Sequence, residues 1–240
     1  MNGIFLENLT WPEAEAAFKQ YTTAVLPIGA RTKEHGYHLP LKNDFVIAEY
    51  LAQRVTALCP VVTLPTVPYG YYPAFVEYPG SVNIRKEVFR DLVCDICRSL
   101  AAHGLKKIYA LNTGISTNTP LALAQEILTS EGIAFQFTDL HRTLVDLKKS
   151  LLTQPVGTHA DELETSMMLY IAPEIVHMDR ARPDANPDRG PGGLTRNPNA
   201  TTGVYSPTGA WGDPTCATRE KGEIYVEALV KELVAAILAM

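Results

Sequence analysis

The stretch that decides the fold is 25-VLPIGARTKEHGYHLPLKND-44. It begins within a short apolar run, residues 23–29, which is typical of a buried strand in an α/β sheet. It ends at Asp44, where apolar residues start to recur at three- and four-residue spacing, as in an amphipathic helix. The residues between form a strand-to-helix loop. Loops at the carboxyl ends of strands carry the functional sites of α/β proteins, so we expect the site here.

This loop holds four side chains of types that bind metal ions, namely Glu34, His35, His38 and Asp44. Imidazole and carboxylate ligands suit zinc or manganese. No cysteine is close in sequence, which argues against a closed structural zinc site. A plainer interpretation stays open: Asp44 is also a favoured helix N-cap residue, and His38 is then a loop histidine hydrogen-bonded to backbone.

Patterns along the rest of the chain predict alternating strands and helices. We expect helices over 11–20, 44–58, 85–103 and 223–240, and strands over 106–112 and 134–140. Thr10 and Glu13 have the spacing of a capping box before the first helix. With 240 residues and 46% hydrophobic content, residues 1–240 are predicted to form a single α/β domain.

Charge and cysteine usage narrow the classes of partner. The net charge is −5 and no Lys/Arg cluster is present, so we expect a small-molecule substrate rather than nucleic acid or a membrane. The sequence shows no targeting segment and no bilayer-length apolar run, which predicts a cytoplasmic protein. Cys94 and Cys97 lie within a strong helical pattern, so their expected role is helix packing.

The central loop resembles the creatininase family of metal-dependent amidohydrolases, whose members carry PxGxxEQHGxHLPxxxD. Here Pro27-Ile28-Gly29 is followed by 35-HGYHLPL-41 and Asp44. The resemblance implies a three-layer α/β/α fold with a central, mostly parallel sheet. It also implies that His35 is a metal ligand and that Asp44 bridges the metal ions. The family's ligand glutamate falls on Lys33, but the loop has one extra residue after Gly29, and we predict that this brings Glu34 to the metal.

Two further segments resemble the substrate-binding loops of the family. Residues 78-YPGS-81 resemble the FPGT segment, which implies that Ser81 lies near the substrate. Residues 112-NTGISTN-118 stand in place of NGHGGN, whose histidine is a metal ligand. Because this histidine is missing, the two-metal site of the family is not carried over intact. One metal ion, an altered second site and no metal at all stay open. We expect the small polar loop to bind substrate through Ser116, together with His38.

Residues 159-HADELETS-166 resemble the family's HAGxxETS closely. This implies that His159 lies at the reaction centre and that Glu164 lines the same pocket and binds metal. A helix start with acidic residues in its first turn is the plainer alternative. Residues 211-WGDPTCATREKG-222 resemble GDPTxATxEKG. The stretch 178–207 lacks hydrophobic periodicity, and we interpret it as a pocket cover or a subunit contact.

The sequence therefore predicts a metal-dependent hydrolase acting on a non-peptide C–N bond of a small cyclic amide or related metabolite. Its catalytic residues are His159 and Glu164, and its metal ligands are Glu34, His35, Asp44 and Glu164. The expected cofactor is zinc or manganese, with iron as a further candidate. The resemblance also implies a homo-oligomer, a hexamer. Two alternatives stay open: a sugar lactonase or isomerase, and a non-catalytic metabolite-binding protein.

Overall fold

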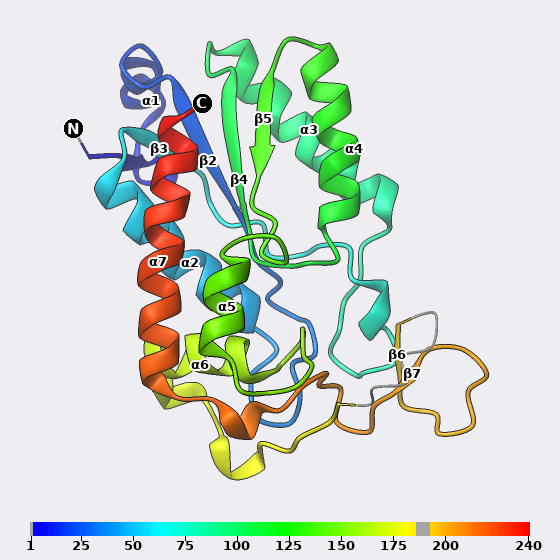
Figure 1. Cartoon of the computed structure of the whole chain (residues 1–240). Helices are drawn as coiled ribbons and strands as arrows, with labels where there is room; N and C mark the ends of the chain where they lie inside the picture. The colour runs from blue at the N-terminus through cyan, green and yellow to red at the C-terminus, as the bar shows by residue number, and fades with distance from the viewer. Residues whose placement is uncertain (1, 186–192) are drawn as a thin grey trace.

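The computed structural model describes residues 2–185 and 193–240, and its central sheet has five parallel strands in the order β1-β3-β2-β4-β5 (Figure 1). The strands are β1 (Ile4–Phe5), β2 (Thr23–Ile28), β3 (Val61–Thr63), β4 (Lys107–Asn112) and β5 (Ala134–Phe137). Every residue of β2 is buried, as expected for a central strand covered on both faces. The predicted α/β fold with a parallel sheet is confirmed.

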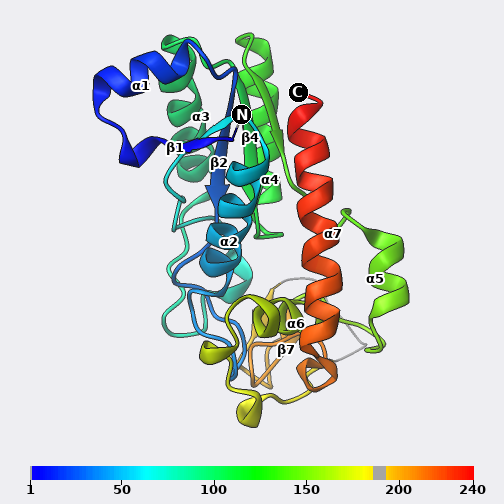
Figure 2. The same cartoon turned by 90° about the vertical axis from the view of Figure 1, so that its left-hand side faces the viewer.

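Helices cover both faces of this sheet (Figures 1 and 2). The helices are α1 (Trp11–Phe18), α2 (Asn43–Leu58), α3 (Lys86–Ala102), α4 (Asn118–Ser130), α5 (Val145–Leu151), α6 (Glu162–Ile171) and α7 (Arg219–Leu238), of which α5 and α6 lie beyond the carboxyl ends of the strands (Figure 1). Successive strand residues point to opposite faces. Leu26 accordingly packs in the same hydrophobic core as residues of α3 and α4, whereas Val25 packs with residues of α2, α6 and α7. The sheet thus separates two cores, which gives three layers.

Strands are added on opposite sides of the pair formed by β2 and β4, so the strand order reverses between these two strands. From β2 it passes through α2 to β3 on one side, and from β4 it passes through α4 to β5 on the other. In parallel sheets, ligands bind outside the carboxyl ends of the strands at such a switch point. The loops 29–42 and 113–117, which follow β2 and β4, therefore face the expected binding crevice.

Several element boundaries differ from prediction, mostly by one or two residues, and three of the differences are informative. Helix α2 begins at Asn43 with Lys42 as N-cap, so the interpretation of Asp44 as the N-cap is wrong. Helix α7 begins at Arg219 rather than 223, because the Thr218 side chain accepts a hydrogen bond from the Lys221 backbone. Strand β5 ends at Phe137 instead of 140. The capping box of Thr10 and Glu13 is confirmed.

The predicted loop 178–207 is partly ordered into two short strands. These are β6 (Leu194–Thr195) and β7 (Val204–Tyr205), which pair with each other, whereas residues 186–192 lie outside the described residues. Cys94 and Cys97 are buried, free thiols on α3, as predicted for helix packing. Among the described residues, no helix is long and apolar enough to cross a membrane.

Candidate functional site

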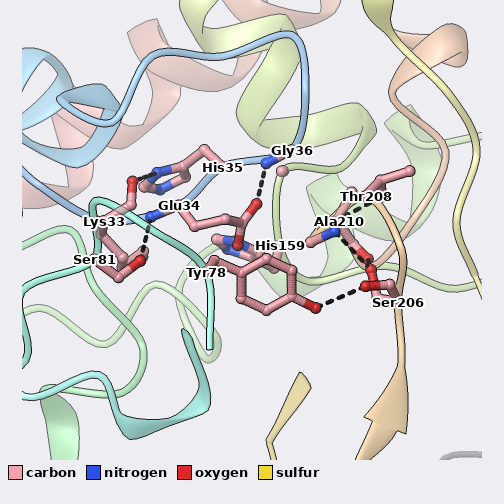
Figure 3. A network of polar contacts seen from close by, with 12 residues as sticks. Lys33, Glu34, His35, Gly36, Tyr78, Ser81, His159, Ser206, Thr208 and Ala210 are labelled. Atoms are coloured by element: carbon pink, nitrogen blue, oxygen red, sulfur yellow. Dashed lines mark hydrogen bonds and ion pairs between the residues drawn. The ribbon is translucent and has the colours of Figure 1, made fainter. Parts of the chain in front are cut away.

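The loop after β2 is held in place by hydrogen bonds to several distant segments. The backbone N–H of Gly29 donates to Val67 (3.2 Å) and that of Arg31 donates to Pro68 (2.8 Å). The backbone N–H of Glu34 donates to the Ser81 hydroxyl (3.0 Å), as Figure 3 shows. The site is thus built on an anchored backbone, a prerequisite for holding ligand atoms at fixed positions.

His35 and Asp44 form the deepest part of the site. His35 Nδ1 lies 2.9 Å from the backbone oxygen of Lys33, and because a carbonyl only accepts, Nδ1 carries the hydrogen. His35 Nε2 then faces Asp44 Oδ1 at 2.8 Å. Burial alone raises the pKa of Asp44, but the charges and hydrogen bonds of Lys33 and His35 outweigh it and hold that pKa well below its ordinary value. Asp44 is therefore a buried carboxylate, ionised at neutral pH.

Lys33 is buried on the other side of Asp44. Its ammonium lies 2.6 Å from Asp44 Oδ2 and 5.0 Å from the centre of the Phe75 ring. Burial lowers the pKa of a lysine, but the carboxylates of Asp44, Glu164 and Glu34 reverse this effect, and the pKa of Lys33 is raised. The side chain therefore stays charged inside the protein.

His159 connects two acidic residues from different segments. Its Nε2 lies 3.0 Å from Glu34 Oε2, and its Nδ1 lies 3.7 Å from Glu164 Oε2. The other Glu34 oxygen accepts from the Gly36 backbone N–H (Figure 3). Glu164 Oε2 also accepts from the backbone N–H of Ala160 (2.6 Å). His159 is thus oriented from both sides.

The pKa of Glu164 is raised to about 7. Burial is the main cause, and the neighbouring carboxylates of Asp44 and Asp161 add to it, whereas His159 and Lys33 oppose it. A carboxyl group with such a pKa exchanges protons near neutrality, which is a property common at catalytic sites.

Three of these side chains form a group of possible metal ligands. His35, His159 and Glu164 each offer a ligand atom, and these atoms lie within 4.8 Å of one another. The structure thus brings together His35 and Glu164 from the predicted ligand set. Asp44 adjoins the group through His35, and Glu34 adjoins it through His159.

The three predicted substrate-binding residues lie in different surroundings. Ser116 lines a cavity of about 120 Å³ beside the site. The Ser81 hydroxyl holds the backbone of Glu34. His38 is buried with its Nε2 2.8 Å from the Thr165 hydroxyl, and it does not line this cavity. Of the three, Ser116 is the one with direct access to a ligand there.

Several residues that line the cavity were not expected from the sequence motifs. It is bounded by Lys33, Ala74, Phe75, Ile115, Ser116, Thr158, His159, Glu164, Gly193, Leu194, Val204 and Trp211. The aromatic residues Phe75 and Trp211 come from loops far apart in sequence. Only the GDPT motif next to Trp211 was a signal for either of them. Leu194 and Val204 belong to the predicted pocket cover, and their positions agree with that role.

A family model and several characterised relatives match this chain over nearly its whole length. A family model described as creatinine amidohydrolase, Creatininase, matches residues 7–237. The 3-dehydro-scyllo-inosose hydrolase of Thermotoga maritima is 27% identical, with 96% of this chain and 81% of that protein covered. The creatinine amidohydrolase of Pseudomonas putida is 26% identical over 98% and 96%. A mycofactocin precursor peptide peptidase of Mycobacterium tuberculosis is 29% identical over 88% and 82%.

Solved creatininase structures share the fold. A manganese form aligns with a TM-score of 0.80 at 24% identity, covering 98% of this chain and 97% of the other. A mutant described as Zn-Zn type aligns equally well, with a TM-score of 0.80 at 24% identity and coverage of 99% and 98%. At this identity the likeness establishes the architecture, and the chemistry has to be argued from the side chains described above.

Proposed function

Since the chain belongs to the creatininase family of amidohydrolases, we propose that it is a metal-dependent hydrolase that opens a non-peptide C–N bond in a small cyclic amide or related metabolite. The observation that carries the proposal is the way His35 is held. Its Nδ1 donates to the Lys33 carbonyl, and its Nε2 lies 2.8 Å from Asp44 Oδ1. Metal-binding histidines are oriented in this manner, with one nitrogen on a carbonyl group and the other directed at the ion.

The donor set fits one divalent ion. His35 and Glu164 offer ligand atoms within 4.8 Å of each other, close to the span of about 4.4 Å that two ligands of one ion with bonds of about 2.2 Å can reach. Asp44 Oδ1, which lies 2.8 Å from His35 Nε2, adds a third donor. We assign the ion to His35 Nε2, Asp44 Oδ1 and Glu164, and zinc, manganese or iron suits this set. A divalent ion in such a site polarises a carbonyl group and activates water.

His159 is then the residue that moves the proton. Its ligand atom lies within reach of both His35 and Glu164, and an imidazole at this position transfers a proton to the leaving nitrogen. For Glu34, which was also predicted as a ligand, we propose the role of orienting His159, because Gly36 and His159 engage its two oxygens. The cavity size and its two aromatic walls suit a small planar ring.

The test combines turnover with metal content. His159→Asn should lower kcat at least about a hundredfold while the ion stays bound, because general acid–base catalysis contributes that much. His35→Ala should lose the ion, and the surface variant His103→Asn serves as the control. Cyclic amides such as creatinine, hydantoin and dihydrouracil are screened by mass spectrometry for the addition of one water. Normal turnover by His159→Asn would refute its role, and loss of the ion in that variant would make His159 a ligand instead.

A second candidate is hydrolysis or isomerisation of a cyclic sugar derivative. The 27% identical relative from Thermotoga maritima, a 3-dehydro-scyllo-inosose hydrolase, favours it. Sugar lactones and keto-inositols in the same screen separate this candidate from the first. Binding of a metabolite without turnover of any compound would favour the third alternative, a non-catalytic binding protein.

A further inference from the structure

The two oxygens of Asp44 face different surroundings. Oδ1 lies against His35 Nε2 and the group of possible ligands, whereas Oδ2 lies against the ammonium of Lys33 at 2.6 Å. Both side chains are almost fully buried, with 6% of Lys33 and 2% of Asp44 exposed. A buried carboxylate oxygen requires a cationic or hydrogen-bonding partner, and on this side the protein supplies its own cation.

The space beyond Oδ2 is small and offers a metal ion a single carboxylate among the described residues. It is a void of about 10 Å³, enough for roughly one water molecule. Of the described residues that line it, Asp44 is the one carboxylate and none is a histidine or cysteine. The amide of Asn112 is already engaged by Thr117, Gly114 and Asn118. An ion arriving here would meet one carboxylate oxygen and a fixed positive charge.

The backbone of Lys33 is anchored on both sides. Its N–H donates to the carbonyl of Leu41 (3.1 Å), and its carbonyl accepts from His35 Nδ1 (2.9 Å). The backbone of Lys33 thus also orients the imidazole of His35, and the ammonium itself is held by its ion pair with Asp44 Oδ2. Displacing Lys33 would also leave the Asp44 charge buried and half-paired, which is unfavourable.

We propose that the ammonium of Lys33 takes the place of a second metal ion, so that this centre holds a single divalent ion beside a built-in cation. The inference deepens the proposed function and rests on it. It sets this chain apart from the solved creatininase described as Zn-Zn type, despite the shared fold. The positive charge of Lys33 then remains when a chelator removes the metal. Only the ion on the Oδ1 side of Asp44 is exchangeable.

Positions 33 and 114 are close enough to Asp44 Oδ2 for substitutions there to create a second metal site. A Cβ atom added at Gly114 would lie 3.9 Å from Asp44 Oδ2, so a side chain at 114 starts close to this oxygen. The double variant Lys33→Glu/Gly114→His removes the ammonium and places a carboxylate and an imidazole around Oδ2. Gly114→His alone keeps the ammonium, and Lys231→Glu at an exposed position makes the same charge change elsewhere.

The experiment counts ions per chain after saturation with Zn²⁺ or Mn²⁺ and removal of free metal. We expect one ion in the native protein, in Gly114→His and in Lys231→Glu, and two in the double variant. Circular dichroism and thermal melting check that each variant is folded. The same count in the double variant and the native protein overturns the inference and leaves the proposed function standing. No ion in the native protein overturns the proposed function, and with it the inference that rests on it.

A measurement on the unmodified protein covers the case in which the double variant does not fold. Native crystals soaked in Mn²⁺ should show one anomalous peak, on the Oδ1 side of Asp44. Lys33 Nζ should remain beside Oδ2. A second peak on the Oδ2 side, with Lys33 displaced, would overturn the inference.

Discussion

The buried histidine His38 makes stability depend on pH. It is 1% exposed, and its Nε2 bonds the Thr165 hydroxyl. Burial, assisted by the nearby His35 and opposed by Glu34, lowers its pKa from 6.5 to about 4. The folded protein therefore keeps His38 neutral between these values, whereas the unfolded chain takes up a proton.

The direction in which stability changes with pH follows from this difference in bound protons. The unfolded state binds more protons between pH 6.5 and about 4, so the free energy of unfolding rises with pH in that window and falls as the solution is acidified. One pKa unit corresponds to about 1.4 kcal/mol, so the full effect is about 3 kcal/mol. Between pH 7.5 and 4.5 the expected loss from His38 is about 2.5 kcal/mol.

Urea unfolding at pH 7.5 and 4.5 measures this loss in the native protein and in His38→Gln. Glutamine keeps a polar group near Thr165 but does not titrate. Other groups, such as Glu34 and Asp44, contribute equally to both proteins, so the difference between the two pH effects isolates His38. We expect the variant to lose about 2.5 kcal/mol less than the native protein. Equal losses in the two proteins would refute the reasoning.

Two further predictions concern packing and a buried charge near α6. Gly222→Ala should destabilise by about 3 kcal/mol or more in urea unfolding, although alanine normally favours a helix, because its Cβ would lie 1.9 Å from the Ser166 backbone oxygen. Unchanged or higher stability would show that the two helices separate easily. Glu162→Gln should cost about 3 kcal/mol by the same assay, since this buried carboxylate pairs with Lys221 and accepts from the Thr153 backbone. Lys221→Met should cost a similar amount, and a negligible effect of both would contradict the pairing.

The sequence was sufficient for the parts of the fold that depend on local pattern. The apolar run before Gly29, the helical spacing after Asp44 and the capping box at Thr10 each reflect short-range periodicity or hydrogen bonding, and the structure confirms these elements. Boundaries were less accurate, because caps such as Thr218 compete with hydrophobic spacing in setting where a helix begins.

The candidate site was predicted in part. The motifs around His35 and His159 identified the two loops, because ligand-type side chains are visible in a sequence. The residue with which each of these side chains pairs was not predicted. Nothing in the spacing indicates that Glu34 turns to His159, 125 residues away, or that His38 is bonded to Thr165 instead of facing the cavity.

The sequence by itself determined which chemical groups are available: a lysine at 33, a glycine at 114, and the histidines and carboxylates of two motifs. Only the tertiary structure decided how their charges pair. The ammonium of Lys33 and the imidazole of His35 lie on opposite oxygens of Asp44 because the loop after β2 folds back over the first turn of α2. A buried charge is stable only with a partner at hydrogen-bond distance, and such distances are set by packing rather than by separation along the chain.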